Sequence, residues 1–209
     1  MTIVFAVHIA DGLLAWPWLV AGGIIALSAV AIGLRGLDEK QIPRVGLLTA
    51  AFFVSSQIHI PLPILPISVH LLLNGLVGVL LRTHAPVAIA IGLAMQAAMF
   101  AHGGYAALGV NACVQLLPAL AAGWCFPWLR HQVAPFAAGA ILGGATAALT
   151  VLLHVLVLWL GGIGDFRIVA GASFLAHLPV VAIEAILVGW SVRVLDRAKP
   201  DWLPAASAS

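Results

Sequence analysis

Long apolar runs with almost no charge between them dominate this sequence and restrict the folds open to it. Hydrophobic residues make up 63% of the 209 residues and charged residues only 8%, whereas a typical soluble domain carries about 25% charged residues. A bilayer core is crossed by helices of about 20 apolar residues, which satisfy their own main-chain polar groups. The chain is therefore predicted to be an all-α, polytopic membrane protein.

Seven apolar segments are separated by polar residues or by proline and glycine. They are residues 13–34, 45–58, 69–82, 86–101, 105–128, 133–160 and 168–194. The sequence thus predicts one membrane-embedded domain over residues 1–199, a bundle of about seven transmembrane helices, and a disordered tail at 200–209. Between the second and third segments, the three prolines of HIPLPILPIS (59–68) exclude a helix and predict a structured loop.

The basic residues predict how the helices are oriented in the membrane. Eight of the nine lysines and arginines follow the first, third, fifth and seventh segments, and only Arg167 lies in a loop of the opposite side. Cytoplasmic loops carry the excess of Lys and Arg. We therefore expect the N-terminus outside and the C-terminus in the cytoplasm.

On this orientation, four of the eight histidines lie at the outer ends of segments or in outer loops. They are His8, His59, His70 and His102. Imidazole is the commonest protein ligand for transition metals of intermediate softness. A single histidine at a membrane interface is as often a simple amphipathic side chain, but four on one side, beside a proline-rich loop, favour a metal site.

Other classes of function find little support in the sequence. The net charge of +2 and the lack of a basic cluster argue against a nucleic-acid partner. HExxH, GxSxG and Walker A motifs are absent, so the chain is not predicted to be an enzyme, and ATP hydrolysis would have to come from other subunits. Glu184 lies well inside the last segment, and an intramembrane carboxylate is a functional candidate. It either bonds to a neighbouring helix or acts in gating, and we do not assign it to the metal.

Four sequence blocks resemble, in the same order, the motifs of the CbiM/NikM-type substrate-binding membrane subunits (S components) of energy-coupling-factor (ECF) cobalt and nickel transporters. The blocks are HIADGLL (8–14), SVHLLLNG (68–75), QAAMFAHGGYAALGVNA (96–112) and LPVVAIEAIL (178–187). The resemblance covers nearly the whole chain.

The resemblance implies a subunit that captures Ni2+ or Co2+, as transported substrate and not as cofactor, at the outer face of the bacterial inner membrane. It implies an ABC-type importer whose partners are an ECF transmembrane coupling subunit, two ATP-binding subunits and a small accessory membrane subunit. SVHLLLNG is nearer to the nickel variant of its motif, but the sequence does not decide between nickel and cobalt. An S component or carrier for another small solute, or a membrane scaffold without transport, remain alternatives.

The resemblance also implies a metal site. His8 corresponds to the chelating histidine and His70 to a further ligand. In the family a free N-terminal amine, the next amide and the histidine ring chelate in one plane, which suits Ni2+ and also Cu2+. Asp11 is expected to shape the turn into the first helix and to cap its first amides. The side chains expected to support the ligands or to line the entry path are His59, His102, Gln96, Asn111 and Asp11.

One departure from the family pattern concerns the N-terminus. His8 stands at position eight instead of position two, so Met1 cannot supply the chelating amine. Valine at position 7 is what an internal GTG start codon would be read as, and we interpret Val7 as the true start. The alternative is a real extension that leaves imidazoles as the strong donors.

We predict that the codon for Val7 is GTG and that the protein made from its own gene begins with methionine at that position, followed by His8. Sequencing the gene and measuring the mass of the N-terminal peptide test this start. Any other codon at position 7 contradicts the prediction.

Overall fold

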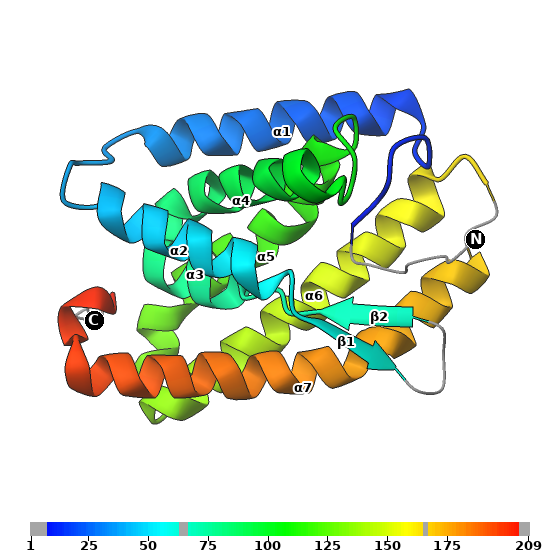
Figure 1. Cartoon of the computed structure of the whole chain (residues 1–209). Coiled ribbons are helices and arrows are strands. Elements are labelled where there is room, and N and C mark those ends of the chain that lie inside the picture. The colour runs from blue at the N-terminus through cyan, green and yellow to red at the C-terminus, as the bar shows by residue number, and fades with distance from the viewer. Residues whose placement is uncertain (1–7, 63–66, 165–166, 205–209) are drawn as a thin grey trace.

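The computed structural model describes residues 8–62, 67–164 and 167–204. Within these ranges the chain forms seven α-helices, with a β-hairpin between the second and the third (Figure 1). The helices are α1 (Trp16–Leu34), α2 (Ile42–Ser55), α3 (Asn74–Leu81), α4 (Ala85–Phe100), α5 (Leu108–Arg130), α6 (Pro135–Gly161) and α7 (Arg167–Ala198). The strands are β1 (His59–Leu62) and β2 (Ile67–His70), and the 3-10 turns are η1 (Arg82–His84) and η2 (Pro200–Trp202).

Among the described residues, five helical stretches are long and apolar enough to cross a membrane. They are Trp16–Leu34, Asn74–Phe100, Leu108–Arg130, Pro135–Gly161 and Phe174–Ala198. The helix α2 is apolar but has only 14 residues. The prediction of a helical membrane bundle is confirmed, but the count of seven crossings is not, since only five stretches meet the length that a crossing requires.

The stretch that holds α3 and α4 changes direction between them. The helix α3 runs parallel to α5. Near the start of α3, Asn74 Nδ2 donates to Gln115 O of α5, and just after the end of α3, Arg82 lies against Gly123, which comes later in α5. At Arg82 the main chain takes a φ of 50°, and α4 runs back toward the hairpin (Figure 1). With eight residues, α3 is about 12 Å long and cannot span a bilayer core by itself.

Proline positions explain where several helices begin. The helices α1, α2, α4 and α6 each carry proline in their first two positions, and none of these four has a side-chain hydrogen bond at its N-cap. Proline suits these positions because its missing N–H would have no partner within the helix, and its φ is already helical. The prolines are Pro17, Pro43, Pro86 and Pro135.

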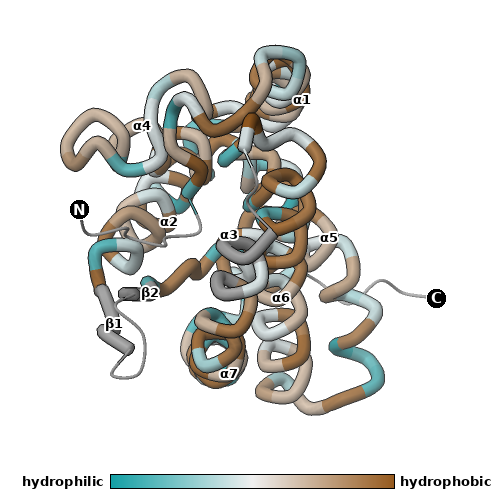
Figure 2. Tube along the Cα trace, turned by 90° about the vertical axis from the view of Figure 1, so that its right-hand side faces the viewer, coloured by the Kyte–Doolittle hydropathy of each residue, from teal (hydrophilic) through white to brown (hydrophobic). Residues whose placement is uncertain are grey.

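Glycines allow the helices to touch at their main chains. A Cβ atom on Gly78 of α3 would lie 2.0 Å from Ala119 O of α5. A Cβ on Gly143 of α6 would lie 2.6 Å from Val188 Cβ of α7. Small residues are enriched at such interfaces in membranes, where close van der Waals packing replaces the hydrophobic effect between helices. Hydrophobic residues occur along all the helices (Figure 2). Many large ones are exposed on the bundle, Leu27 and Trp159 among them, as expected of helices that contact lipid.

The proline-rich segment forms the hairpin, so the prediction of a structured loop is confirmed for its described part. The two strands pair antiparallel, with His59 opposite His70 and Leu62 opposite Ile67. Residues 63–66 lie outside the described residues. After His70 the chain stays non-helical through Leu73 before α3 begins. The third apolar segment, predicted from residue 69, therefore becomes helical only at residue 74.

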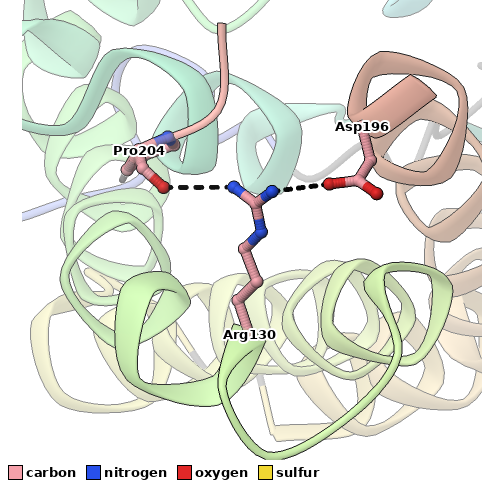
Figure 3. Close-up of polar contacts among 3 residues, drawn as sticks. All are labelled: Arg130, Asp196 and Pro204. Atoms are coloured by element: carbon pink, nitrogen blue, oxygen red, sulfur yellow. Dashed lines mark hydrogen bonds and ion pairs between the residues drawn. The ribbon is translucent and has the colours of Figure 1, made fainter. Parts of the chain in front are cut away.

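The chain remains folded beyond α7, which corrects part of the tail predicted at 200–209. The turn η2 and the two residues that follow fold back onto the bundle, where Leu203 is 4% exposed and belongs to the main apolar core. Arg130 Nη2 lies 2.6 Å from Asp196 Oδ1 of α7, and Arg130 Nη1 donates to Pro204 O (Figure 3). The last five residues lie outside the described part of the chain.

The two ends of the bundle differ in charge. One end, here called the basic end, holds eight of the nine lysines and arginines. They are Arg35, Lys40, Arg44, Arg82, Arg130, Arg193, Arg197 and Lys199. The opposite end, here called the histidine end, holds the start of α1, the hairpin, the end of α4 and the start of α7 (Figure 1). The orientation in the membrane was predicted from this grouping of lysines and arginines on one side. The structure shows the grouping, and the orientation stays a prediction.

We expect Gly78→Ala to destabilise the fold by about 1–3 kcal/mol, because the added methyl group overlaps main-chain atoms of α5. Gly46→Ala is the matched control: Gly46 also lies in a helix, but a Cβ there meets nothing within 4 Å. That variant should be neutral or more stable by up to about 1 kcal/mol. Thermal unfolding in detergent measures both, and an equal loss in the two variants would contradict the packing described.

Candidate functional site

Three of the four histidines expected at the outer side come together at the histidine end. The rings of His8 and His70 are stacked, with centroids 4.9 Å apart and planes 12° apart. The ring of His102 lies 6.3 Å from that of His8. His70 is fully buried, whereas His8 and His102 are partly exposed. Residues from the N-terminal segment, the hairpin and the loop after α4 thus converge.

Asn111 holds the main chain next to His8 in place. Its Oδ1 accepts from Ile9 N at 2.8 Å, and its Nδ2 donates to Ile9 O at 2.9 Å and to Gly103 O at 3.1 Å. The amide at the start of α5 therefore binds both polar groups of Ile9 and also ties them to the glycine loop. Asn111 was predicted to support the site, and the structure places it where it binds the main chain of Ile9, the residue next to His8.

Asp11 connects the N-terminal segment to the loop between α4 and α5. Its Oδ2 accepts from Tyr105 N and its Oδ1 from Ala107 N, both at 2.9 Å. Ala107 is the N-cap residue of α5. The expected role as a cap of the first helix is therefore wrong, because the N-cap position of α1 is Ala15 and has no side-chain bond. The carboxylate instead satisfies amides that lie 94 and 96 residues away in the sequence.

The two glycines of the HGG motif make room for these contacts. Gly103 and Gly104 have φ values of 81° and 70°, a region that favours glycine. A Cβ on Gly104 would lie 2.3 Å from Asp11 Cγ, and one on Gly103 would lie 2.8 Å from Asn111 Nδ2 and 3.2 Å from His8 Cβ. The motif therefore lets the loop press directly against the segment that carries His8.

His70 is held by its own chain and, through it, by α7. Its Nδ1 lies 3.0 Å from Leu71 O. The next two amides both donate to Glu184 of α7: Leu72 N lies 2.6 Å from Oε1, and Leu73 N lies 3.0 Å from Oε1 and 3.1 Å from Oε2. Two roles were left open for Glu184, a bond to a neighbouring helix or a part in gating. The structure shows a bond to another segment, but the partner is the main chain just before α3 and not a helix. The sequence held no signal for these partners, because no side chain of Leu72 or Leu73 takes part.

The remaining predicted residues are placed as follows. Gln96 is fully buried in α4, and both atoms of its amide lack a hydrogen-bond partner among the described residues; its main-chain oxygen faces His102 N at 3.4 Å. The strand register sets the main chain of His59 opposite His70, but its side chain lies outside what the structure describes. Val7, the expected amine donor, also lies outside the described residues.

The donor set limits the chemistry of this site. A metal ion sits about 2 Å from an imidazole nitrogen, so two rings with centroids 4.9 Å apart can reach one ion after small rotations. Within the described part of the chain, no three His, Cys, Asp or Glu side chains form a ready group of metal ligands. A site at His8 and His70 therefore needs additional donors, and main-chain nitrogen next to His8 is the nearest source by sequence.

A separate cavity lies far from these rings. It has a volume of about 500 Å3, opens at the basic end, and is lined by Arg44, Arg82, His84 and the segment from Asp201 to Pro204. Neither His8 nor His70 borders it. This cavity is therefore not part of the histidine site.

The chain is similar to known proteins over nearly its whole length. The family model described as "CbiM: Cobalt uptake substrate-specific transmembrane region" matches residues 8–202. The "Putative metal transport protein" of Haemophilus influenzae is 36% identical over 203 residues, which cover 93% of this chain and 95% of that protein. "Cobalt transport protein CbiM" of Sorangium cellulosum is 32% identical over 213 residues, covering 94% of each. A crystal structure of a transition metal transporter shares the fold, with a TM-score of 0.79 at 21% identity over 91% of this chain and 92% of that one.

We expect Gly104→Ala to destabilise the protein more than Gly12→Ala. Both glycines have positive φ, 70° and 82°, so alanine at either costs about 1–2 kcal/mol of main-chain strain. Only at Gly104 does the methyl group overlap Asp11, since a Cβ on Gly12 meets nothing within 4 Å. The overlap should add about 1–3 kcal/mol. Unfolding temperatures of the two variants measure the difference, and equal temperatures would show that Asp11 does not press on the loop.

Proposed function

Because the chain belongs to the CbiM family of cobalt-uptake substrate-specific transmembrane proteins, we propose that it is the metal-capturing subunit of an ECF-type importer for Ni2+ or Co2+. The chain is a multi-pass membrane protein whose relatives are named as metal transport proteins. Transport and not catalysis is therefore its proposed activity. The ion is the transported substrate and not a resident cofactor.

The observation that carries this proposal is the meeting of His8 and His70. These residues lie 62 positions apart in the chain, yet their rings are 4.9 Å apart at the end of the bundle opposite the basic residues. Two imidazoles at this spacing suit a divalent transition metal. The basic end is the one expected in the cytoplasm, which leaves the histidine end to receive the ion from outside.

The full ligand set that we propose adds main-chain nitrogen to the two rings. If translation starts at position 7, the terminal amine, the amide of His8 and its ring close two small chelate rings, and His70 supplies the next nitrogen. His102 and His59, from the loop after α4 and from β1, would then guide the ion inward. Gln96 contributes buried amide atoms near the end of α4, while Asn111 and Asp11 keep the chelating segment in position.

Energy for transport must come from partners in this proposal. The sequence has no Walker A motif, so it cannot bind ATP in the usual way. We propose an ECF transmembrane coupling subunit, two ATP-binding subunits and a small accessory membrane subunit as those partners, on the basis of the family. The bacterial inner membrane is the matching location.

The proposal predicts that His8→Ala and His70→Ala each weaken Ni2+ or Co2+ binding by more than the 10–100-fold typical of losing a residue that only supports a ligand. The control is His131→Ala, an exposed histidine at the basic end, which should bind as the unaltered protein does. Equilibrium binding of each ion to the purified protein starting at position 7 measures this and ranks nickel against cobalt. Full binding in either of the first two variants would overturn that histidine as a ligand, and an unaltered protein that binds neither ion would favour a carrier of another solute or a scaffold.

Acidification gives a second test. Imidazole and amine nitrogens bind metal only when deprotonated, so binding releases protons. Affinity should be highest at alkaline pH, fall as the pH drops below about 8, the ordinary pKa of a terminal amine, and fall more steeply below about 6.5, the ordinary pKa of imidazole. Titrations from pH 8 to pH 5 measure the trend, and an affinity that does not change with pH would exclude nitrogen ligands.

A further inference from the structure

Glu184 makes an unusual contact for a carboxylate inside an apolar helix. It is 1% exposed, and both of its oxygens accept from main-chain amides of the segment that follows His70. No lysine or arginine is paired with it among the printed contacts of the described residues. Its partners are thus two N–H groups of irregular main chain, and a buried N–H without a partner is costly.

The position of these amides explains the need for a remote partner. Leu73 is the N-cap residue of α3, it takes a left-handed conformation with φ of 49°, and it has no side-chain oxygen to cap the helix. The first amides of a helix lack partners within the helix and attract negative charge. Glu184 accepts from the two amides just before these, those of the N-cap Leu73 and of Leu72. The glutamate of a capping box binds the N-cap amide in the same way from within its own helix, whereas Glu184 does so from α7.

The contact of Glu184 with the amides of Leu72 and Leu73 lies next to His70, the proposed metal ligand. Only Leu71 separates His70 from the first of the two amides, and Leu71 O itself lies 3.0 Å from His70 Nδ1. We propose that Glu184 is a positioning residue that clamps residues 71–73 to α7 and thereby holds the His70 ring at the ion. This inference rests on the proposed function, because it takes His70 as a metal ligand.

Helix α7 is a firm support for this clamp. Over its length it packs on α6 through Gly139 and Gly143, where a Cβ would lie 2.6–2.9 Å from atoms of Val188 and Val192 or from main-chain oxygens of α7. At the basic end Asp196 pairs with Arg130 (Figure 3). The carboxylate is therefore carried by a helix that packs on α6 at Glu184 itself and at Val188 and Val192 beyond it.

The test compares Glu184→Gln with Asp196→Asn, a matched removal of one charge from the same helix at the basic end. The amide of glutamine keeps the size of the side chain but offers one acceptor instead of two, and its NH2 faces an N–H. We expect Glu184→Gln to weaken metal binding about 10–100-fold, to speed metal dissociation, and to shift the ligand-field absorption of the bound ion. Asp196→Asn should change none of these.

A second measurement needs no metal. Hydrogen–deuterium exchange of the metal-free protein should rise at residues 71–74 in Glu184→Gln and stay unaltered in Asp196→Asn. Should Glu184→Gln fail to fold, Glu184→Asp replaces it, because its side chain is one methylene shorter and cannot reach both amides. Unaltered exchange and unaltered affinity would overturn the clamp.

The two proposals fail in different ways. If the unaltered protein and both variants bind neither ion, the proposed function is wrong and Glu184 positions no metal ligand, whatever the exchange shows. If the unaltered protein binds metal and His70→Ala does not, but Glu184→Gln binds like the unaltered protein, the transport proposal stands and the positioning role is overturned.

Discussion

Main-chain polar groups buried among apolar helices must find partners, and the histidine end shows how this chain meets that requirement. Three irregular segments meet there, and each is bound by one side chain from elsewhere in the sequence. Asn111 binds Ile9, Asp11 binds the loop before α5, and Glu184 binds the segment after His70. A carboxylate or amide can accept or donate more than one bond, which makes these residues suited to irregular main chain. The arrangement of the rings depends on these three contacts.

The same requirement explains the close relation between the polar residues and the glycines. A carboxylate reaches the amides of a loop only if the loop lies against it, and Gly104 allows Asp11 that approach. In the interior, Gly78 and Gly143 bring helices to main-chain distance. Glycine therefore has two uses here: it packs helices in the membrane, and it brings loop amides within hydrogen-bond reach of acids.

The sequence predicted the helices well wherever length and apolar composition decide the structure, since the five stretches long enough to cross a membrane coincide with predicted apolar segments. It failed where a distant contact decides. The apolar residues from 69 to 73 were predicted as helix, but residues 69 and 70 pair with β1, and the amides of Leu72 and Leu73 bind Glu184, more than 100 residues away. For the same reason Asp11 was wrongly predicted to cap the first helix: its partners are main-chain amides just before α5. That His8, His70 and His102 lie at one end was predicted from their places along the apolar segments, and their roles toward a metal stay predictions; a main-chain partner leaves no trace in the sequence.

These contacts divide the molecule into a frame and the segments attached to it. The helix pairs α3–α5 and α6–α7 touch at main-chain distance, so they cannot slide without steric overlap. The histidine-bearing segments are held largely by hydrogen bonds, both from the side chains of Asn111, Asp11 and Glu184 and from main-chain pairs such as Ala15 N to Gly161 O, which can exchange partners at smaller cost. A rearrangement of these segments relative to the frame would break contacts such as those of Asn111, Asp11 or Glu184 before it disturbs the helix packing. Of these, the Glu184 contact is the one that lies next to a predicted ligand and on a helix that reaches the basic end.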